Sequence, residues 1–126
     1  MVQQAAQQIT EFLRDRAGRG LRTVVIVRDE NYDVHYLRSD LEAQYSDETF
    51  SEVVDIFRLD SPFLAPDVNS NPVGERRAII HYHERAFIIQ FPFSETESIL
   101  ISLSRDAGRD LLQFIEKCRS IVHDGQ

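Results

Sequence analysis

The segment Leu21 to Val27 (LRTVVIV) carries apolar side chains on both faces of an extended strand. Such a strand is stable inside a sheet that other elements cover on both sides. Ala86 to Phe91 (AFIIQF) has the same character, and Ser98 to Leu103 (SILISL) nearly so. Three strands of this kind predict a central sheet that lies between two layers of helices.

Two further segments are amphipathic and are expected at the edges of that sheet. In Tyr32 to Leu37, the side chains of Tyr32, Val34 and Tyr36 share one face, and polar side chains occupy the other. Arg76 to His83 alternates in the same way. Alternation of this type is typical of a strand with one face covered and one face in water.

Three segments carry apolar residues at helical spacing. The first runs from Val2 to Ala17 and ends at Gly18. The second begins after Ser46, its predicted cap, and the third runs from Arg105 to His123 after the predicted cap Ser104. The apolar stripes consist of Val2, Ala5, Ala6, Ile9, Phe12 and Leu13 in the first helix, Phe50, Val53, Val54 and Phe57 in the second, and Leu111, Phe114, Ile115, Cys118 and Val122 in the third.

These elements follow the order α-β-β-α-β-β-β-α in a single domain, residues 1–126. Short turns at Glu84-Arg85 and at Ser94 to Glu97 favour antiparallel hairpins. With the amphipathic strands at the edges, short connections give the strand order 2-1-5-4-3. The predicted fold is therefore α+β, a three-layer α/β/α sandwich on a five-stranded antiparallel sheet. The first and last helices would cover one face and the middle helix the other.

Asp60 to Gly74 is the one long irregular stretch and contains three prolines. Connections of this length are often functional or mobile. We expect its apolar residues to fold back over the core; they are Phe63, Leu64 and Val68.

The element order and burial pattern resemble the roadblock family of small interaction modules, relatives of the dynein light chain and of prokaryotic partners of small GTPases. In the wider sense the pattern is similar to profilin. The resemblance implies a non-catalytic adaptor that forms a homodimer through its sheet edge and middle helix. It also implies a protein partner such as a small GTPase or another signalling protein. The loop Asp60 to Gly74 departs from the family because it is longer and richer in proline than the usual connection.

The stretch YDVHYLRSDLEAQYSDETFSEVVDIFRLD, together with the SLSRD helix cap, resembles small uncharacterised haloarchaeal proteins. Composition agrees with that resemblance: the net charge is −7 and the pI about 5.0. Lys117 is the single lysine among 14 basic residues. An acidic surface in which arginine replaces lysine competes well for water in concentrated salt. A genome rich in G and C would also favour arginine codons, so both explanations stay open.

Charge and hydropathy exclude several classes of function. The chain lacks the cationic stripe that nucleic-acid binding usually needs, so no nucleic-acid partner is expected. It also lacks an apolar run long enough for a membrane span and the pattern of a secretion signal. With one cysteine, the chain cannot form an internal disulfide bond that would stabilise the fold. A cytoplasmic protein without a cofactor is therefore expected.

His81 and His83 are one residue apart on a strand and therefore point to one face. Two histidines can hold a metal ion if a third ligand converges on them. Glu84, His35 and His123 are the candidates for that third ligand, but no spacing brings them together. The alternative is that both histidines belong to the polar outer face of an edge strand, so no metal ligand is assigned.

Three short features have structural explanations that outweigh catalytic ones. Cys118 lies on the apolar stripe of the last helix, where a thiol is usually a small buried hydrophobe, and His123 does not face it. Gly18-Arg19-Gly20 lacks the ending of a phosphate loop and is typical of a helix stop. Ser104, which could begin an anion site, stands near Asp106 and is better explained as a cap. No catalytic residue is therefore assigned.

Three functions remain in competition. The first is a non-catalytic interaction or regulatory module. The second is a small-molecule or metal sensor that uses the long loop as a lid, and the third is an enzyme with a cryptic site. Tyr32, Tyr36 and Tyr45 could form an exposed aromatic patch for a partner, or they could be partly buried under the middle helix.

Overall fold

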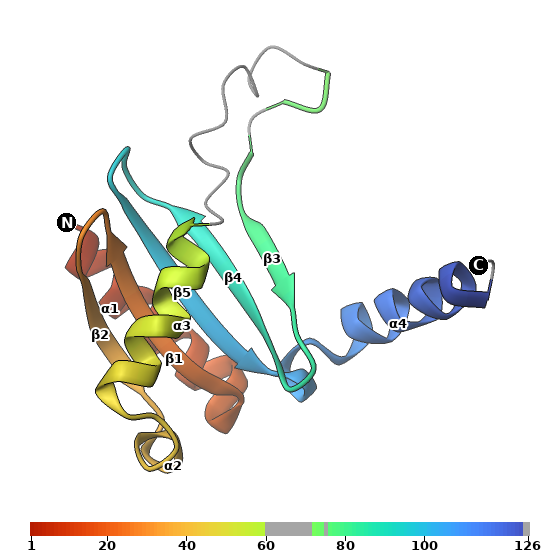
Figure 1. Ribbon diagram of the computed structural model, residues 1–126, viewed down its shortest axis with the longest axis horizontal. Coiled ribbons are helices and arrows are strands. Elements are labelled where there is room, and N and C mark those ends of the chain that lie inside the picture. The colour runs from red at the N-terminus through yellow and green to blue at the C-terminus, as the bar shows by residue number, and fades with distance from the viewer. Residues whose placement is uncertain (60–71, 75, 125–126) are drawn as a thin grey trace.

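A five-stranded antiparallel sheet forms the centre of the computed structural model, in the order β2-β1-β5-β4-β3 (Figure 1). The structure describes residues 1–59, 72–74 and 76–124, with the backbone alone at 59, 114, 115 and 122–124. The predicted α+β class and strand order are confirmed. The elements are α1 (Val2–Ala17), the 3₁₀ helix η1 (Gly18–Gly20), β1 (Leu21–Arg28), β2 (Tyr32–Leu37), α2 (Ser39–Glu42), α3 (Asp47–Leu59), β3 (Ile79–Tyr82), β4 (Ala86–Pro92), β5 (Glu97–Ser104), the 3₁₀ helix η4 (Arg105–Gly108) and α4 (Arg109–Asp124).

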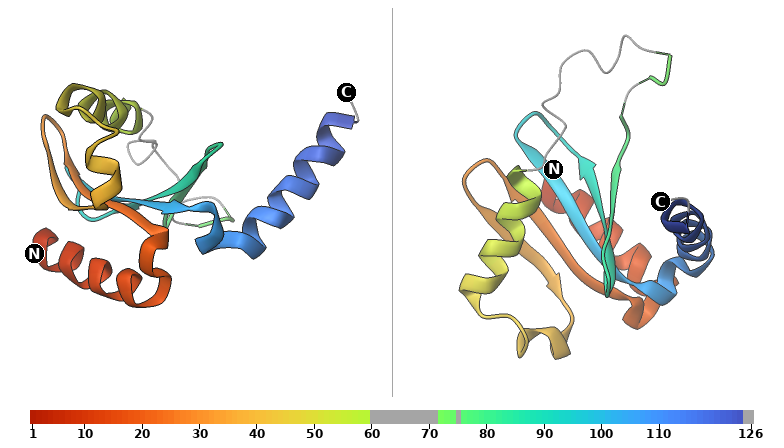
Figure 2. Two further views of the ribbon diagram at one scale, coloured as in Figure 1. Left: turned by 90° about the horizontal axis from the view of Figure 1, so that it is seen from below. Right: turned by 45° about the vertical axis from the view of Figure 1, so that its right-hand side comes forward.

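Helices α1 and α3 lie on opposite faces of the sheet (Figure 2). Residues 23–27 of β1 are all buried, as expected for a strand that is covered twice. The core on the α1 side includes Val2, Ala6, Leu21, Val24, Ile26, Phe87, Ile101 and Leu103, and the core on the α3 side consists of Val25, Val27, Val54, Phe57 and Leu100.

Two predicted helix boundaries have clear local causes. Gly18 adopts a φ of +55°, a left-handed conformation that ends α1 and that glycine tolerates best. The Ser46 hydroxyl accepts a hydrogen bond from the backbone N–H of Thr49 at 3.1 Å, which caps α3 as predicted. Ser104 also stands at a helix N-terminus, but its hydroxyl makes no capping hydrogen bond with η4. The predicted N-cap position of Ser104 is therefore confirmed, whereas the expected capping hydrogen bond of its side chain is not formed.

Helix α4 does not lie beside α1. It extends away from the sheet beyond the β3 edge (Figures 1 and 2), so the expectation that the first and last helices share one face is wrong. Leu112 is buried, whereas Leu111, Cys118 and Ile121 are exposed. The expected burial of the Cys118 thiol is wrong for the same reason. Phe114, Ile115 and Val122, which were assigned to the same stripe, are outside the described side chains.

A bulge in β2 overturns the expected alternation of its side chains. Val24 pairs with Tyr36 and Val25 pairs with Val34, so the register skips His35. One extra residue in a strand reverses the faces of everything beyond it. Tyr32 therefore packs on the α3 side and Tyr36 on the α1 side.

The edge strand β3 is shorter than predicted. It covers Ile79–Tyr82 instead of Arg76 to His83. Ile89, on the neighbouring strand β4, is only half-buried, although the pattern of Ala86 to Phe91 predicts a strand covered on both faces, because α4 does not cover it. Most of the long loop, residues 60–71, is outside the described residues, as are Phe63, Leu64 and Val68.

Candidate functional site

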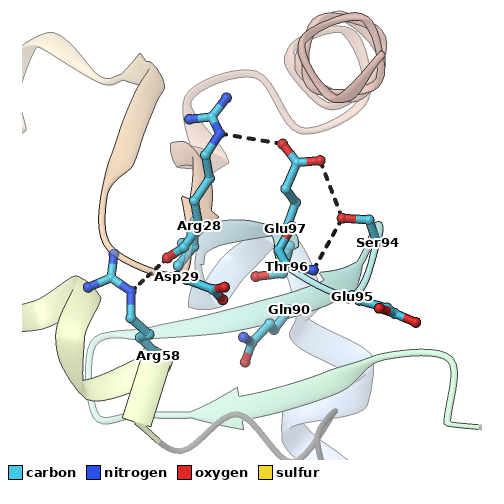
Figure 3. A pocket seen from close by; sticks show the side chains of 10 residues that line it. Arg28, Asp29, Arg58, Gln90, Ser94, Glu95, Thr96 and Glu97 are labelled. Carbon is cyan, nitrogen blue, oxygen red and sulfur yellow. Dashed lines mark hydrogen bonds and ion pairs between the residues drawn. The ribbon is translucent and has the colours of Figure 1, made fainter.

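A polar pocket of about 120 Å³ lies where the β1–β2 turn, the end of α3 and the β4–β5 turn meet (Figure 3). Cavities that hold drug-sized ligands are about 300–1,000 Å³, so this pocket has room for a small ion or a few waters. Its lining consists of Val27, Arg28, Asp29, Arg58, Gln90, Ser94, Glu95, Thr96, Glu97 and Ser98.

Arg58 ties the end of α3 to the β1–β2 turn. Its Nε donates to the carbonyl oxygen of Arg28 at 2.8 Å, and its Nη2 donates to that of Asn31 at 2.8 Å. The remaining nitrogen donates to Asp55, one helical turn earlier. With all three nitrogens engaged, this guanidinium acts as a structural clamp.

Arg28 is held in a similar way by two carboxylates. Its Nη1 donates to Asp33, and its Nε lies 3.4 Å from Glu97. The hydrogen bond to Asp33, with the charges of both carboxylates, raises the pKa of Arg28 above its ordinary value. Ser94 in turn donates to Glu97 at 3.3 Å. These groups satisfy one another and close the end of the sheet.

Gln90 forms the buried part of this pocket, with 1% of its surface exposed. Its Oε1 lies 3.3 Å from Nε2 of His81. Carboxylates of Asp29 and Glu95 also line the pocket and would repel an anion. The pocket is therefore best explained as a structural frame.

His81 on β3 and His83 just beyond the strand point to the same side, as predicted, and it is the side of the sheet on which α3 lies. Both rings meet the edge of Phe57 from α3, with centroids 4.8 and 5.8 Å away. His35 lies on the opposite side, where it contacts Gln7 of α1 at 2.8 Å. In the part of the chain that the structure describes, no group of three His, Cys, Asp or Glu residues is placed to hold a metal ion. The His123 side chain is outside that part.

The three tyrosines do not form one patch. Tyr32 and Tyr45 flank Phe50 of α3, with ring centroids 5.7 and 5.6 Å away. Tyr36 lies on the other face, below the guanidinium of Arg14 at 5.3 Å. The bulge in β2 is the cause of this separation.

A cluster that the sequence did not reveal joins α4 to β3. The Tyr82 hydroxyl donates to Oε1 of Glu116 at 2.5 Å and accepts a hydrogen bond from Arg105 at 2.6 Å. Arg119 also donates to Glu116, at 2.7 Å. The hydrogen bond between Tyr82 and Glu116 raises the pKa of Tyr82 and lowers that of Glu116. We call Tyr82, Arg105 and Glu116 the anchor cluster.

The other side of α4 is apolar and exposed. Leu112 and Glu116, four residues apart, lie on the side of α4 that contacts the body of the molecule. Leu111, Cys118 and Ile121 lie on a different side, and Ile121 is 63% exposed. We call these three residues the outer face of α4. Exposed apolar surface on a helix indicates a binding surface more often than a catalytic one.

The match to a known family extends over nearly all of the chain. A model described as a domain of unknown function (DUF7522) matches residues 7–123. The chain belongs to the DUF7522 family. The match reaches from α1 into the last turn of α4, so the DUF7522 domain includes the outer face of α4 and the anchor cluster. No curated protein matches the chain.

Among the helices that the structure describes, none has both the length and the apolar character that a membrane span needs.

Proposed function

We propose that this DUF7522 domain is a non-catalytic interaction or regulatory module that acts in the cytoplasm. The observation that carries the proposal is the outer face of α4, an apolar surface on a helix held away from the sheet. A helix in a protein gains most of its stability when its apolar side packs against other parts of the structure. A partner that covers this side would supply that packing.

The edge strand β3 offers a second surface next to the first. Ile80 on this strand is 49% exposed, and among the strands that the structure describes β3 pairs with β4 alone. Unpaired backbone groups of an edge strand can accept a strand from another chain. Together, β3 and α4 support binding of a protein better than binding of a small molecule.

The class of partner is proposed from the resemblance, and the cellular setting from the composition. The roadblock-like element order supports a small GTPase or another signalling protein as the partner, and a homodimer as the working form. The acidic, lysine-poor composition supports a haloarchaeal setting with concentrated salt. The alternative, a small-molecule sensor, has weaker support because the polar pocket beside Arg58 is small and its two arginines are held by other groups of the protein, while the larger hollow between α1 and η4 is an open surface groove.

Affinity capture with matched baits tests the proposal. The baits are the wild-type chain, the double variant Leu111→Glu/Ile121→Glu, and the control Gln113→Glu, which adds charge at an exposed polar position of the same helix. We expect at least one protein from the native lysate, in molar salt, to bind the wild type and the control but not the double variant. An identical set of bound proteins on all three baits would contradict the proposal.

A further inference from the structure

The α1 face of the sheet is covered over only part of its width. Helix α1 contacts β1 more extensively than it contacts β2 or β5. Its flank toward β2 carries Gln7 and Arg14, which contact His35 and Tyr36. Strand β4 lies two strands from β1 on the other side, about 10 Å away at a spacing of about 4.8 Å per strand. Packed helices are also about 8–10 Å apart, so the uncovered width over β4 fits one helix.

That uncovered part is apolar. Ile89 and Phe91 of β4 and Tyr82 of β3 are half-buried on the α1 side. Ile80 pairs with Ile89 and shares its face. On α1, the flank away from β2 carries Phe12, which is 55% exposed.

A surface groove of about 650 Å³ lies between the C-terminal end of α1 and η4, and its lining includes Phe12, Arg16, Leu103 and Asp106 but no residue of β4 or β3. On the sheet itself, η4 and the base of α4 cover the Phe87 end of β4. In the described part of the chain, Ile89 and Phe91 farther along β4 stay half-buried, and the Phe12 ring beside them on α1 stays exposed.

Helix α4 has the matching length and surface. Its 16 residues span about 24 Å at 1.5 Å per residue. Strand β4, with 7 residues, spans about 23 Å. The outer face of α4 is thus an exposed apolar helix surface. The β4 surface is an apolar sheet surface of similar length.

The contacts at the base of α4 oppose its folding back onto its own β4. The anchor cluster fixes the second turn of α4 against Tyr82 at the β3 edge. Gly108, at the junction of η4 and α4, packs so closely on the Phe87 ring that a Cβ there would lie 2.7 Å from it. Leu112 is buried beside them. Reversal of α4 would break all of these contacts.

We infer that α4 packs over β4 of a second copy of the chain, and that two copies exchange their C-terminal helices about a two-fold axis. A second copy is favoured over another protein because it carries both an exposed apolar helix face and an incompletely covered apolar sheet surface, so each copy covers the β4 surface of the other. Exchange of an element between identical chains is a low-cost route to a dimer. The inference rests on the proposed interaction function and names a second copy of the chain as the molecule that covers the outer face of α4.

Sedimentation velocity in molar salt is the first test. We expect a mass of two chains at micromolar concentration for the wild type and for Gln113→Glu. The double variant Leu111→Glu/Ile121→Glu should have the mass of one chain. A wild-type monomer, or a double variant that stays dimeric, would overturn the inference. If capture still shows partners that depend on α4, the proposed function survives that failure.

The single lysine allows a second test that separates exchange from folding back. An amine-reactive diazirine attaches to the chain at Lys117, on the border of the outer face, and otherwise only to the N-terminal amine. Protein with natural nitrogen is mixed with ¹⁵N protein, equilibrated, labelled and irradiated. We expect cross-links from Lys117 to residues 86–92 that join one light and one heavy peptide. Cross-links within one isotope alone, or none to β4, would overturn the inference. Lys117→Arg is the matched control and should lose these cross-links.

Discussion

The Tyr82 hydroxyl lies 2.5 Å from the Glu116 carboxylate and joins β3 to α4 across 34 residues of sequence. This hydrogen bond is charge-assisted, which makes it stronger than one between neutral groups. Arg105 donates to the same hydroxyl from η4. The direction in which α4 leaves the sheet therefore depends on a few polar contacts at its base.

Removal of the phenol should release the base of α4. In Tyr82→Phe, we expect faster amide hydrogen exchange in residues 109–117 and unchanged exchange in β1, because the core contacts of β1 do not involve this hydroxyl. Mass spectrometry of exchanged peptides measures both regions at once. Equal exchange of α4 in variant and wild type would show that the hydrogen bond does not hold the helix.

The same contact should appear in an alkaline titration. Hydrogen bonding to Glu116 raises the pKa of Tyr82 above its ordinary value of 10.0. The stabilisation from this raised pKa is present below pH 10 and is lost as pH rises through the raised value. The difference in ultraviolet absorbance between wild type and Tyr82→Phe isolates this phenol. Glu116→Gln should move its midpoint back down, and an unchanged midpoint would contradict the assignment.

Acid should weaken the contact between α4 and β3 by protonating Glu116. The hydrogen bond from Tyr82 lowers the pKa of Glu116 below 4.5. The stabilisation from a lowered carboxylate pKa is present above pH 4.5 and is lost as pH falls through the lowered value. Backbone NMR shifts of α4 should change in that window. The Glu116→Gln variant is the control, and its α4 shifts should lack this transition.

Phe57 should carry a large share of the packing between α3 and the sheet. It is 4% exposed and contacts His81 of β3 and His83 just beyond that strand. Truncation of a buried phenylalanine to alanine costs about 3–5 kcal/mol of unfolding free energy. Urea unfolding of Phe57→Ala should show this loss, whereas Lys117→Ala, at an exposed position, should change little. Similar losses in both variants would contradict the buried position of Phe57 on α3.

Gly108 should tolerate no larger residue while Phe87 keeps its ring. A Cβ at position 108 would lie 2.7 Å from that ring. Overpacking of this kind typically costs about 1–3 kcal/mol, so thermal unfolding of Gly108→Ala should show a lowered Tm. Phe87→Leu in the same chain should recover part of the loss by double-mutant analysis. Strict additivity of the two changes would argue against the contact.

Concentrated salt should stabilise the fold if the acidic composition reflects a haloarchaeal setting. Screening of like charges is largely complete by about 0.3 M, where the Debye length is below about 6 Å. A Tm that continues to rise in molar potassium chloride would reflect hydration and ion effects at the carboxylate surface. A Tm independent of salt would contradict the haloarchaeal proposal.

The parts of the fold that sequence could predict are those set by local periodicity. The doubly apolar pattern of Leu21 to Val27 placed β1 at the centre, and the helical stripe of α3 placed Phe57 in the core. The β2 bulge was not predictable, because its one-residue shift has no signal in the alternation around His35. The anchor cluster was also missed, since Tyr82 and Glu116 are far apart in sequence. An apolar stripe indicates that α4 packs against something, but not whether the surface belongs to its own chain.

The bulge at His35 has a consequence for how far this protein can assemble. A bulge distorts the ladder of an edge strand and makes it a poor template for another strand. Of the two sheet edges, β2 carries this distortion and β3 pairs regularly with its neighbour. Copies that met through both edges could add one after another into an open-ended filament. With one regular edge, any contact between two copies through β3 would end at a closed pair.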